Sequence, residues 1–256
     1  MKPIIVASKK DKAGMNIVEN LKKLGCKIPI YLIDKEIINA ENIDKELDAD
    51  FIVFASKHQS EKEVSTLTVH PIGNWGEANF GGISNKISLS NPLLLKHFFQ
   101  TLFQNTKSLD YKISLEATHH GPFIKTPSLF IEIGSTEKQW EDKTAGKIIA
   151  QTIIKSVASF KEQNLKIAIG VGGPHYCPNF NQIQLQDKYA ISHIIAEYVL
   201  PLNEKMIEEA IAKTVGKVDS FILDWKGMGN SEKRNKSLEI LKKFNLEIIR
   251  TKDAKC

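Results

Sequence analysis

Short apolar runs alternate with segments of helical spacing along most of the chain. Runs rich in Ile, Val and Phe are typical of buried strands, whereas apolar residues three or four positions apart are typical of amphipathic helices. The runs that predict strands are residues 3–7, 28–33, 51–55, 67–70, 112–118, 128–133, 166–171, 218–223 and 246–249. The segments that predict helices are residues 16–24, 92–103, 136 to about 160, 203–213 and 231–243. This alternation predicts an α/β fold with a largely parallel sheet.

A stretch rich in Gly and Asn interrupts this pattern at about residues 71–90. Loops of this length are uncommon in compact domains and are usually functional or mobile. The chain contains no repeat, low-complexity tract or Pro/Ser-rich linker. We therefore expect a single α/β domain over residues 1–256, with this loop inserted into it.

Composition narrows the class of protein. The 256 residues are 42% hydrophobic and 25% charged, which is ordinary globular usage and excludes a disordered or fibrous chain. No apolar run approaches the roughly 18 residues of a membrane span, and the polar residues after the first run come too early for a signal peptide. Cys26, Cys177 and Cys256 are widely spaced, which favours a reducing compartment over a disulfide framework. We expect a cytoplasmic protein with no membrane contact and no obligate protein partner.

The net charge of +5 permits a nucleic-acid partner without requiring one. Basic residues crowd the last part of the chain: Lys226, Lys233, Arg234, Lys236, Lys242, Lys243, Arg250, Lys252 and Lys255. A solvated helix face explains this concentration as well as a phosphate-binding surface does.

The histidines carry the most informative chemistry. Five of the seven follow predicted strands: His58, His70, His119, His120 and His175. Ligands of open α/β sheets bind beyond the carboxyl ends of the strands, so we expect these five to meet at that edge. A single histidine there is more often just a hydrogen-bonded side chain, so the prediction depends on the grouping. His97 and His193 lie in helical stretches and are expected to be structural or at the surface.

Two glutamates accompany these histidines. Glu132 lies in an apolar strand, where an unpaired inward carboxylate would be costly, so it is the best candidate carboxylate. Glu116 is a candidate if it faces the core and ordinary if it faces water. Adjacent His119 and His120 would point to opposite faces if their strand continued, so at most one would face the site. Imidazole and carboxylate are the ligand set of catalytic zinc, which predicts a hydrolytic metal site.

Other motifs limit the chemistry. The chain has neither the G-x-S-x-G elbow of serine hydrolases nor the H-E-x-x-H of zincins. Gly172-Gly173-Pro174 lacks the spacing of a nucleotide-binding loop and predicts a tight turn that lets the backbone approach a ligand. Cys177 could ligate a metal, but a small buried thiol is the more common role.

Five segments carry a resemblance to a known family, in wording and in order. They are Ser56-Lys57-His58, residues 67–74, Ala117-Thr118-His119-His120-Gly121-Pro122, residues 132–136 with Trp140, and Gly172-Gly173-Pro174-His175-Tyr176. The chain resembles the archaeal and plant type of D-aminoacyl-tRNA deacylase. This resemblance implies hydrolysis of the ester between a D-amino acid and the 3′ end of tRNA, with one or two zinc ions. It also implies a three-layer α/β/α fold with a mixed, largely parallel sheet, related to phosphorylases and peptidyl-tRNA hydrolases. Cys177 departs from the small residue expected after the last motif.

The pattern and the resemblance together give a set of predicted roles. The candidate metal ligands are His70, His120, His175 and Glu132, and the candidate catalytic groups are Glu116, Glu132 and His119. The candidate contacts to substrate and tRNA are His58, Asn74, Trp75, Gly173 and Tyr176. Trp75 and Phe80 could stack the terminal adenine, although packing of the loop explains Trp75 equally well.

Two other functions stay open at this point. One is a metal-dependent hydrolase of a small molecule, of a peptidase or nucleoside-processing type. The other is a tRNA-binding module without catalysis, which the histidines disfavour because phosphate contacts use Arg and Lys.

Overall fold

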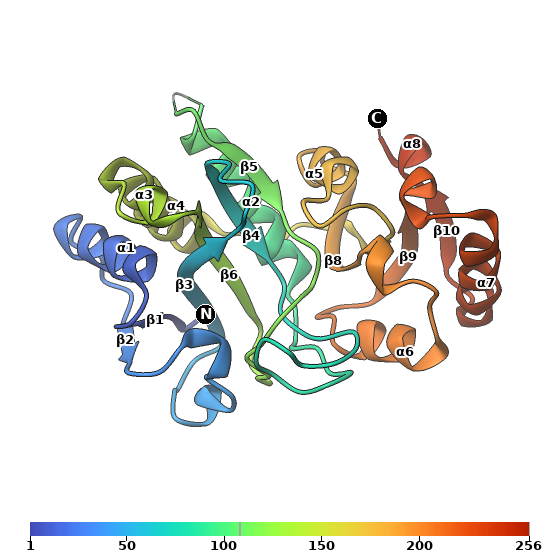
Figure 1. The fold of residues 1–256 in the computed structure, drawn as a ribbon, viewed down its shortest axis with the longest axis horizontal. Helices are drawn as coiled ribbons and strands as arrows, with labels where there is room; N and C mark the ends of the chain where they lie inside the picture. The colour runs from blue at the N-terminus through green and yellow to red at the C-terminus, as the bar shows by residue number, and fades with distance from the viewer. Residues whose placement is uncertain (108, 256) are drawn as a thin grey trace.

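The computed structural model describes residues 1–107 and 109–255, which form two sheets separated by helices (Figure 1). The first sheet has the strand order β2-β1-β3-β6-β4-β5. Its strands are β1 (Pro3–Ser8), β2 (Ile30–Ile33), β3 (Phe51–Gln59), β4 (Thr66–His70), β5 (Lys112–Leu115) and β6 (Ser128–Ser135). β4 runs antiparallel to β6 and parallel to β5, whereas the other pairs are parallel.

The second sheet is parallel throughout, in the order β10-β9-β7-β8. Its strands are β7 (Lys166–Val171), β8 (Tyr189–Ile195), β9 (Val218–Leu223) and β10 (Glu247–Arg250). The α/β class with mixed, largely parallel sheets is therefore confirmed.

Helices cover both sheets and fill the space between them. The α-helices are α1 (Lys12–Lys23), α2 (Pro92–Asn105), α3 (Glu137–Trp140), α4 (Lys143–Ser159), α5 (Pro178–Gln184), α6 (Glu204–Ala212), α7 (Ser231–Leu241) and α8 (Thr251–Ala254). The short 3-10 helices are η1 (Ile37–Asn39), η2 (Ile43–Lys45), η3 (Glu197–Val199), η4 (Trp225–Met228) and η5 (Lys242–Phe244). α2 contacts β4 of the first sheet and β8 of the second, so it joins the two (Figure 1).

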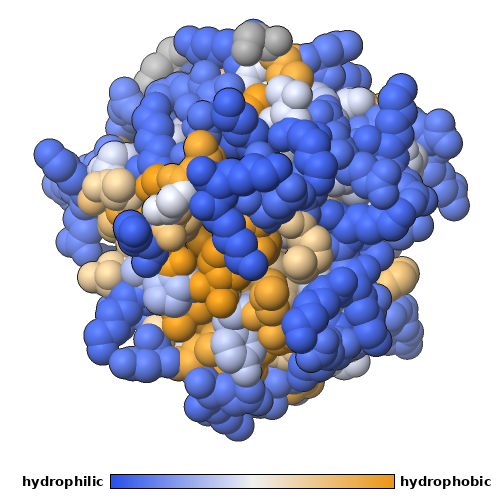
Figure 2. Space-filling model, turned by 90° about the vertical axis from the view of Figure 1, so that its left-hand side faces the viewer, coloured by the Kyte–Doolittle hydropathy of each residue, from blue (hydrophilic) through white to orange (hydrophobic). Residues whose placement is uncertain are grey.

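The β2 edge lies at one end of the molecule, and the face at that end shows apolar side chains among hydrophilic ones (Figures 1 and 2). Among the described residues, none of the helices combines the length and the apolar character that a membrane crossing needs.

The central strands of the first sheet alternate between two environments. Val53 and Ile131 face a core shared with α1, α2 and α4. On the opposite face the rings of Phe54 and Phe130 stack, with 4.9 Å between centroids. Two residues further along β6, that face turns polar at Glu132. One strand face therefore passes from a packed core into a cluster of titratable side chains.

Several predicted elements differ from the observed ones. Residues 189–195 form β8, not a helical stretch, and every position in this strand is buried. A wholly buried strand lacks the alternation that separates strand from helix. The predicted helix 136–160 is two helices, because the Asp142 side chain accepts hydrogen bonds from the backbone N–H groups of Thr144 and Ala145 and starts α4. α5 was not predicted.

Cys26 and Cys177 are free thiols, and Cys256 lies outside the described residues.

Candidate metal centre and catalytic cavity

A cavity of about 1310 Å³ lies over the polar face of the first sheet. His58 and Glu132 from β3 and β6 line it, together with His119, His120 and His175 from segments that follow β5 and β7. The sequence predicted a site beyond the carboxyl edge of one parallel sheet. The cavity differs from this prediction, because its lining residues lie on or after strands of opposite direction and come from both sheets. Because β4 is antiparallel to β6, its last residue, His70, pairs with Phe130 inside β6.

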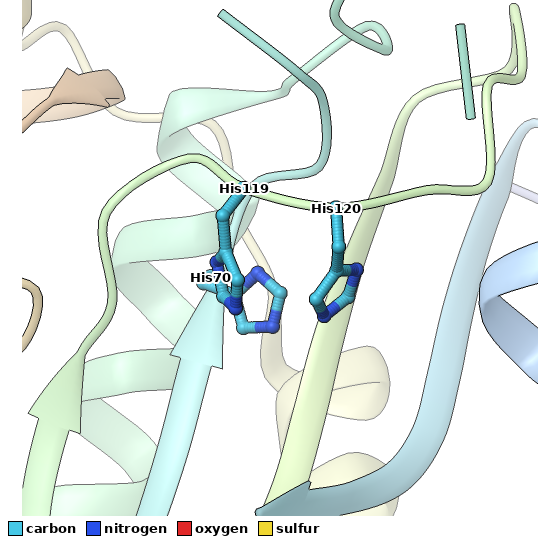
Figure 3. A group of neighbouring side chains, drawn as sticks. All are labelled: His70, His119 and His120. Carbon is cyan, nitrogen blue, oxygen red and sulfur yellow. The ribbon is translucent and has the colours of Figure 1, made fainter. Parts of the chain in front are cut away.

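Three histidines form the first group, which we name the histidine triad: His70, His119 and His120 (Figure 3). His70 ends β4, and the other two lie on the segment that passes over it. One ring nitrogen from each lies within 4.8 Å of the others. This is the spacing of atoms that can hold one metal ion.

Backbone carbonyls fix the tautomers of the histidine triad. The Nδ1 atoms of His70, His119 and His120 lie 3.0, 2.8 and 2.7 Å from the carbonyl oxygens of Pro71, Ala117 and Gly121. A carbonyl oxygen only accepts, so each Nδ1 carries the proton and each Nε2 keeps its lone pair. Nε2 of His70 is buried and makes no hydrogen bond to any described residue. Metal-bound histidines are typically anchored in this way through the other ring nitrogen.

Burial keeps the histidine triad neutral. Desolvation, with the neighbouring imidazoles, lowers the pKa of His70 to about 4 and that of His120 to about 3. Burial, the charge of His120 and that of His70 also hold the pKa of His119 well below its usual value. Neutral imidazole is the form that binds a metal, so the triad is poised to donate three lone pairs.

The chain path explains why adjacent His119 and His120 reach the same point. β5 ends at Leu115, three residues earlier than predicted, so the alternation of a strand does not apply here. His120 adopts φ 45°, in the left-handed region. The prediction that at most one of this pair would face the site assumed that the strand continued; that condition is not met, and both rings belong to the histidine triad.

A second group surrounds the carboxylate of Glu116, which is fully buried. His175 Nε2 donates to Glu116 Oε2 at 2.9 Å, and His58 Nδ1 lies 3.1 Å from Oε1. His119 Nε2 is 3.3 Å from Oε2, so this group touches the histidine triad. We name His58, Glu116 and His175 the carboxylate group; they too could hold a metal ion.

The carboxylate group favours charged side chains, whereas the triad favours neutral ones. Burial raises the pKa of Glu116, but the hydrogen bonds from His175 and His58 outweigh it and leave the pKa well below its usual value. Burial lowers the pKa of His58, but Glu116 outweighs it and the pKa is raised. Glu116 is thus an ionised carboxylate that faces the core and has partners, which is the condition under which the sequence made it a candidate.

Glu132 joins the two groups. Its Oε2 lies 3.5 Å from His70 Nε2 and 3.8 Å from His58 Nδ1, and its side chain is almost fully buried. Burial and the charge of Glu116 raise the pKa of Glu132 well above its usual value. The carboxyl group of Glu132 therefore holds its proton more tightly than a free glutamate does. His70, Glu116 and Glu132 are a third set that could hold a metal ion.

The residues predicted to contact the substrate have different surroundings in the structure. Tyr176 places its hydroxyl 2.7 Å from His58 Nε2, so it orients a site histidine. Asn74 donates to the carbonyl of Gly81 at 2.8 Å and braces the loop. Trp75 borders the cavity, yet it is 7% exposed and belongs to the core of the second sheet, as the packing interpretation expected.

The turn after β7 packs against protein. Gly173 has φ 84°, and a Cβ added there would lie 2.9 Å from Asp224 Oδ2. The close approach that this glycine permits is therefore to Asp224. Cys177 is buried, and its thiol donates to the carbonyl of His175 at 3.2 Å. Burial raises the pKa of this thiol, which fits a structural role.

The two remaining histidines are structural, as expected. His97 Nε2 contacts Ser159 Oγ at 3.1 Å on the surface of α2. His193 Nε2 donates to the carbonyl of Lys213 at 3.0 Å, and its Nδ1 lies 3.2 Å from Thr118 Oγ1.

Sequence reasoning missed two residues near the site. The hydroxyl of Tyr198, on η3, lies 3.4 Å from His175 Nδ1. Asp11 caps α1, and its carboxylate accepts from the Ser56 hydroxyl at 3.0 Å and from the Lys57 N–H at 2.8 Å. The capping pattern before α1 could have identified Asp11, whereas no motif surrounds Tyr198.

Comparisons with known proteins point to one family. A family model described as D-aminoacyl-tRNA deacylase matches residues 45–249. Curated relatives named D-aminoacyl-tRNA deacylase include that of Thermococcus onnurineus, 36% identical over 96% of this chain and 99% of the relative. The relative from Methanocaldococcus jannaschii is also 36% identical, over 91% of this chain and 94% of its own.

A solved structure described as a conserved protein of unknown function has the same fold. It is 28% identical, covers 99% of this chain and 96% of its own, and has a TM-score of 0.91.

Proposed function

Because the chain belongs to the D-aminoacyl-tRNA deacylase family, we propose that it hydrolyses the ester bond of D-aminoacyl-tRNA and releases the D-amino acid and tRNA. The observation that carries the chemistry is the histidine triad, with three Nδ1 atoms on backbone carbonyls and three neutral Nε2 atoms left to bind. Its donor set fits zinc, which favours imidazole and keeps an open position in catalytic sites. We assign His70, His119 and His120 as the ligands of this ion.

A bound zinc ion supplies Lewis-acid chemistry, since it polarises a carbonyl oxygen and lowers the pKa of a coordinated water to about 7. The side chains of the carboxylate group would handle the proton. His175 lines the cavity, and its Nε2–H is held by ionised Glu116, which leaves Nδ1, 3.4 Å from the Tyr198 hydroxyl, as the ring nitrogen with a lone pair. Nδ1 of His175 takes a proton from the attacking water and later returns it to the leaving ribose oxygen. Glu116 stabilises the imidazolium and, because it is fully buried, reaches the cavity through the side chains around it.

Glu132 and His58 complete this arrangement. Glu132 lines the cavity beside the triad, and because its pKa is raised, its protonated form would be available to donate a hydrogen bond to substrate oxygen. Tyr176 and Glu116 hold His58 from its two ring nitrogens. The carboxylate group also has the spacing of a second metal site. Counting the bound ions therefore distinguishes two cases: with one ion the carboxylate group transfers protons, and with two ions it holds the second ion.

The cavity is large enough for the end of the substrate. Its volume of about 1310 Å³ exceeds the roughly 300–1000 Å³ of small-molecule pockets, which suits an aminoacyl group together with its terminal nucleoside. Chiral selection would come from steric rejection of L side chains. Basic residues after Trp225 would contact phosphates, so tRNA affinity should fall with salt.

The direct test is hydrolysis of matched D- and L-tyrosyl-tRNA, with and without a chelator and added zinc. We expect cleavage of the D form alone, lost with the chelator and restored by zinc. D-selective cleavage that ignores the chelator would contradict zinc and keep the deacylase function. Binding of tRNA without cleavage, or cleavage only of small esters or nucleosides, would contradict the deacylase function and support the corresponding alternative.

A further inference from the structure

The loop at residues 71–90 carries an aromatic side chain, that of Phe80, which is exposed to solvent. Phe80 is 69% exposed, more than any other large hydrophobic side chain among the described residues. It borders the same cavity as His119 and His120. Trp75, the other aromatic residue of this loop, is only 7% exposed and packs in the core of the second sheet.

The backbone around Phe80 is fixed on both sides. The carbonyl of Phe80 accepts from Gly121 N–H at 2.9 Å, and Gly82 N–H donates to Glu41 Oε1 at 2.6 Å. A Cβ added at Gly81, which has φ 70°, would overlap the carbonyl oxygen of Ile38. The loop is therefore closely packed while its aromatic side chain stays outside. An exposed apolar ring on a preformed backbone binds a flat partner with little ordering cost.

The position of Phe80 relates it to the reacting bond. Gly121, its hydrogen-bond partner, directly follows His120 of the histidine triad. In an aminoacyl-tRNA, the ester and the terminal adenine are attached to the same ribose. A base held at Phe80 is thus one ribose away from an ester held at the triad. Unpaired RNA bases are commonly bound by stacking on aromatic side chains.

We propose that Phe80 is the stacking platform for the terminal adenine of the tRNA substrate, an assignment that rests on the proposed deacylase function. The competing occupant of this ring face is an aromatic side chain of the D-amino acid. The competing platform is Tyr198, which is also exposed and lines the cavity beside His175.

The test uses Phe80→Ala and Phe80→Trp on two substrates, D-alanyl-tRNA and D-tyrosyl-tRNA. Because adenine is common to both, Phe80→Ala should raise KM about tenfold for each and leave kcat unchanged. Phe80→Trp should restore the wild-type KM. Phe103→Ala is the matched control, since Phe103 is an exposed aromatic residue on α2 and does not line the cavity.

Three results would overturn the assignment. They are an unchanged KM in Phe80→Ala, an increase confined to D-tyrosyl-tRNA, and a KM increase for both substrates in Tyr198→Ala that exceeds the increase in Phe80→Ala. A bound zinc content equal to that of the wild type would show that Phe80→Ala keeps the site intact. Failure of the deacylase function itself would be visible separately, as an absence of cleavage by the unaltered protein.

Discussion

The histidine triad and the carboxylate group lie side by side beneath one cavity, but their imidazoles have opposite kinds of partner. In the triad, Nδ1 of each ring donates to a neutral carbonyl, as His70 does to Pro71. In the carboxylate group, His58 and His175 face the ionised oxygens of Glu116. A carbonyl fixes the tautomer without adding charge, so burial lowers the pKa of His70. A carboxylate favours the charged imidazole and raises the pKa of His58 despite burial.

This difference separates two tasks that a hydrolytic site needs. In the proposed function, the triad would hold the metal ion and the carboxylate group would handle protons, although His119 Nε2 is only 3.3 Å from Glu116 Oε2. Placing the two side by side would let a bound metal ion polarise the ester carbonyl while a nearby base accepts the proton of the attacking water. Substitutions in the two groups should therefore differ in their effects on metal content and on turnover.

The largest effect should come from the triad. In His120→Ala, one of three ligands is lost, so we expect loss of bound zinc and a fall in kcat/KM of about 10³-fold or more. Metal content and deacylation of D-tyrosyl-tRNA are the measurements. His97→Ala is the control, because His97 lies at the surface of α2, and it should change neither. A His120→Ala protein that keeps both its zinc and its turnover would remove this residue from the metal site.

A smaller effect should follow from neutralising the carboxylate group. Glu116→Gln keeps the shape but removes the charge that faces His58 and His175, so kcat should fall about 10–100-fold. The triad should still retain one zinc ion, measured by metal analysis. Exposed Glu141, which pairs with Lys12, gives the matched control Glu141→Gln. If Glu116→Gln loses all of its metal, as His120→Ala should, the two groups form one metal site and the distinction between them fails. Loss of one ion of two would assign a second ion to the carboxylate group.

The candidate site shows which features could be predicted from the sequence and which could not. The apolar strand around Glu132 predicted a buried, functional carboxylate, because an inward charge needs a reason to be there. The clustering of His119 with His120 was not predicted, because it depends on φ 45° at His120. Histidine adopts positive φ more often than most residues do, but the residue type alone does not predict it at a given position. Histidines could thus be chosen as candidates, but their division into two groups required coordinates.

Long-range packing set the other limits. The α/β class followed from local alternation, since each strand and helix has its own period. The antiparallel direction of β4 and the burial of β8 against α2 depend on contacts between distant segments. Gly173 was assigned to a ligand for the same reason: the turn was evident, but its neighbour Asp224, 51 residues further along, was not.

A still smaller change tests the orientation of the carboxylate group. Tyr176→Phe removes the hydroxyl that lies 2.7 Å from His58 Nε2. Loss of one hydrogen bond should lower kcat about fivefold and leave KM unchanged. The exposed pair of Tyr31 with Glu46 offers Tyr31→Phe as the control. A raised KM for tRNA with unchanged kcat would instead return Tyr176 to the substrate-contact role predicted from the sequence.

The smallest effect on activity should come from His193, a histidine outside both groups. Its substitution tests whether a lowered pKa is by itself enough to identify a histidine as a metal ligand. Burial lowers the pKa of His193 to about 4, as it does for His70. Both nitrogens of His193 are used, however, one by the carbonyl of Lys213 and the other by Thr118. We therefore expect His193→Gln to keep its zinc and its turnover, because burial alone does not make a histidine a ligand.

The same substitution should be visible in stability. The unfolded chain protonates His193 near its ordinary pKa of 6.5, while the folded chain does so only near 4. Between these values the unfolded state binds more protons, so the free energy of unfolding falls as pH falls through this window, by about 3 kcal/mol for this residue. Denaturant unfolding of wild type and His193→Gln at several pH values isolates this contribution, because His70 and His120 contribute equally to both proteins. Parallel curves for the two proteins would show that His193 does not resist protonation. Loss of zinc in His193→Gln would show that the second ring nitrogen is not what separates a ligand from a buried structural histidine.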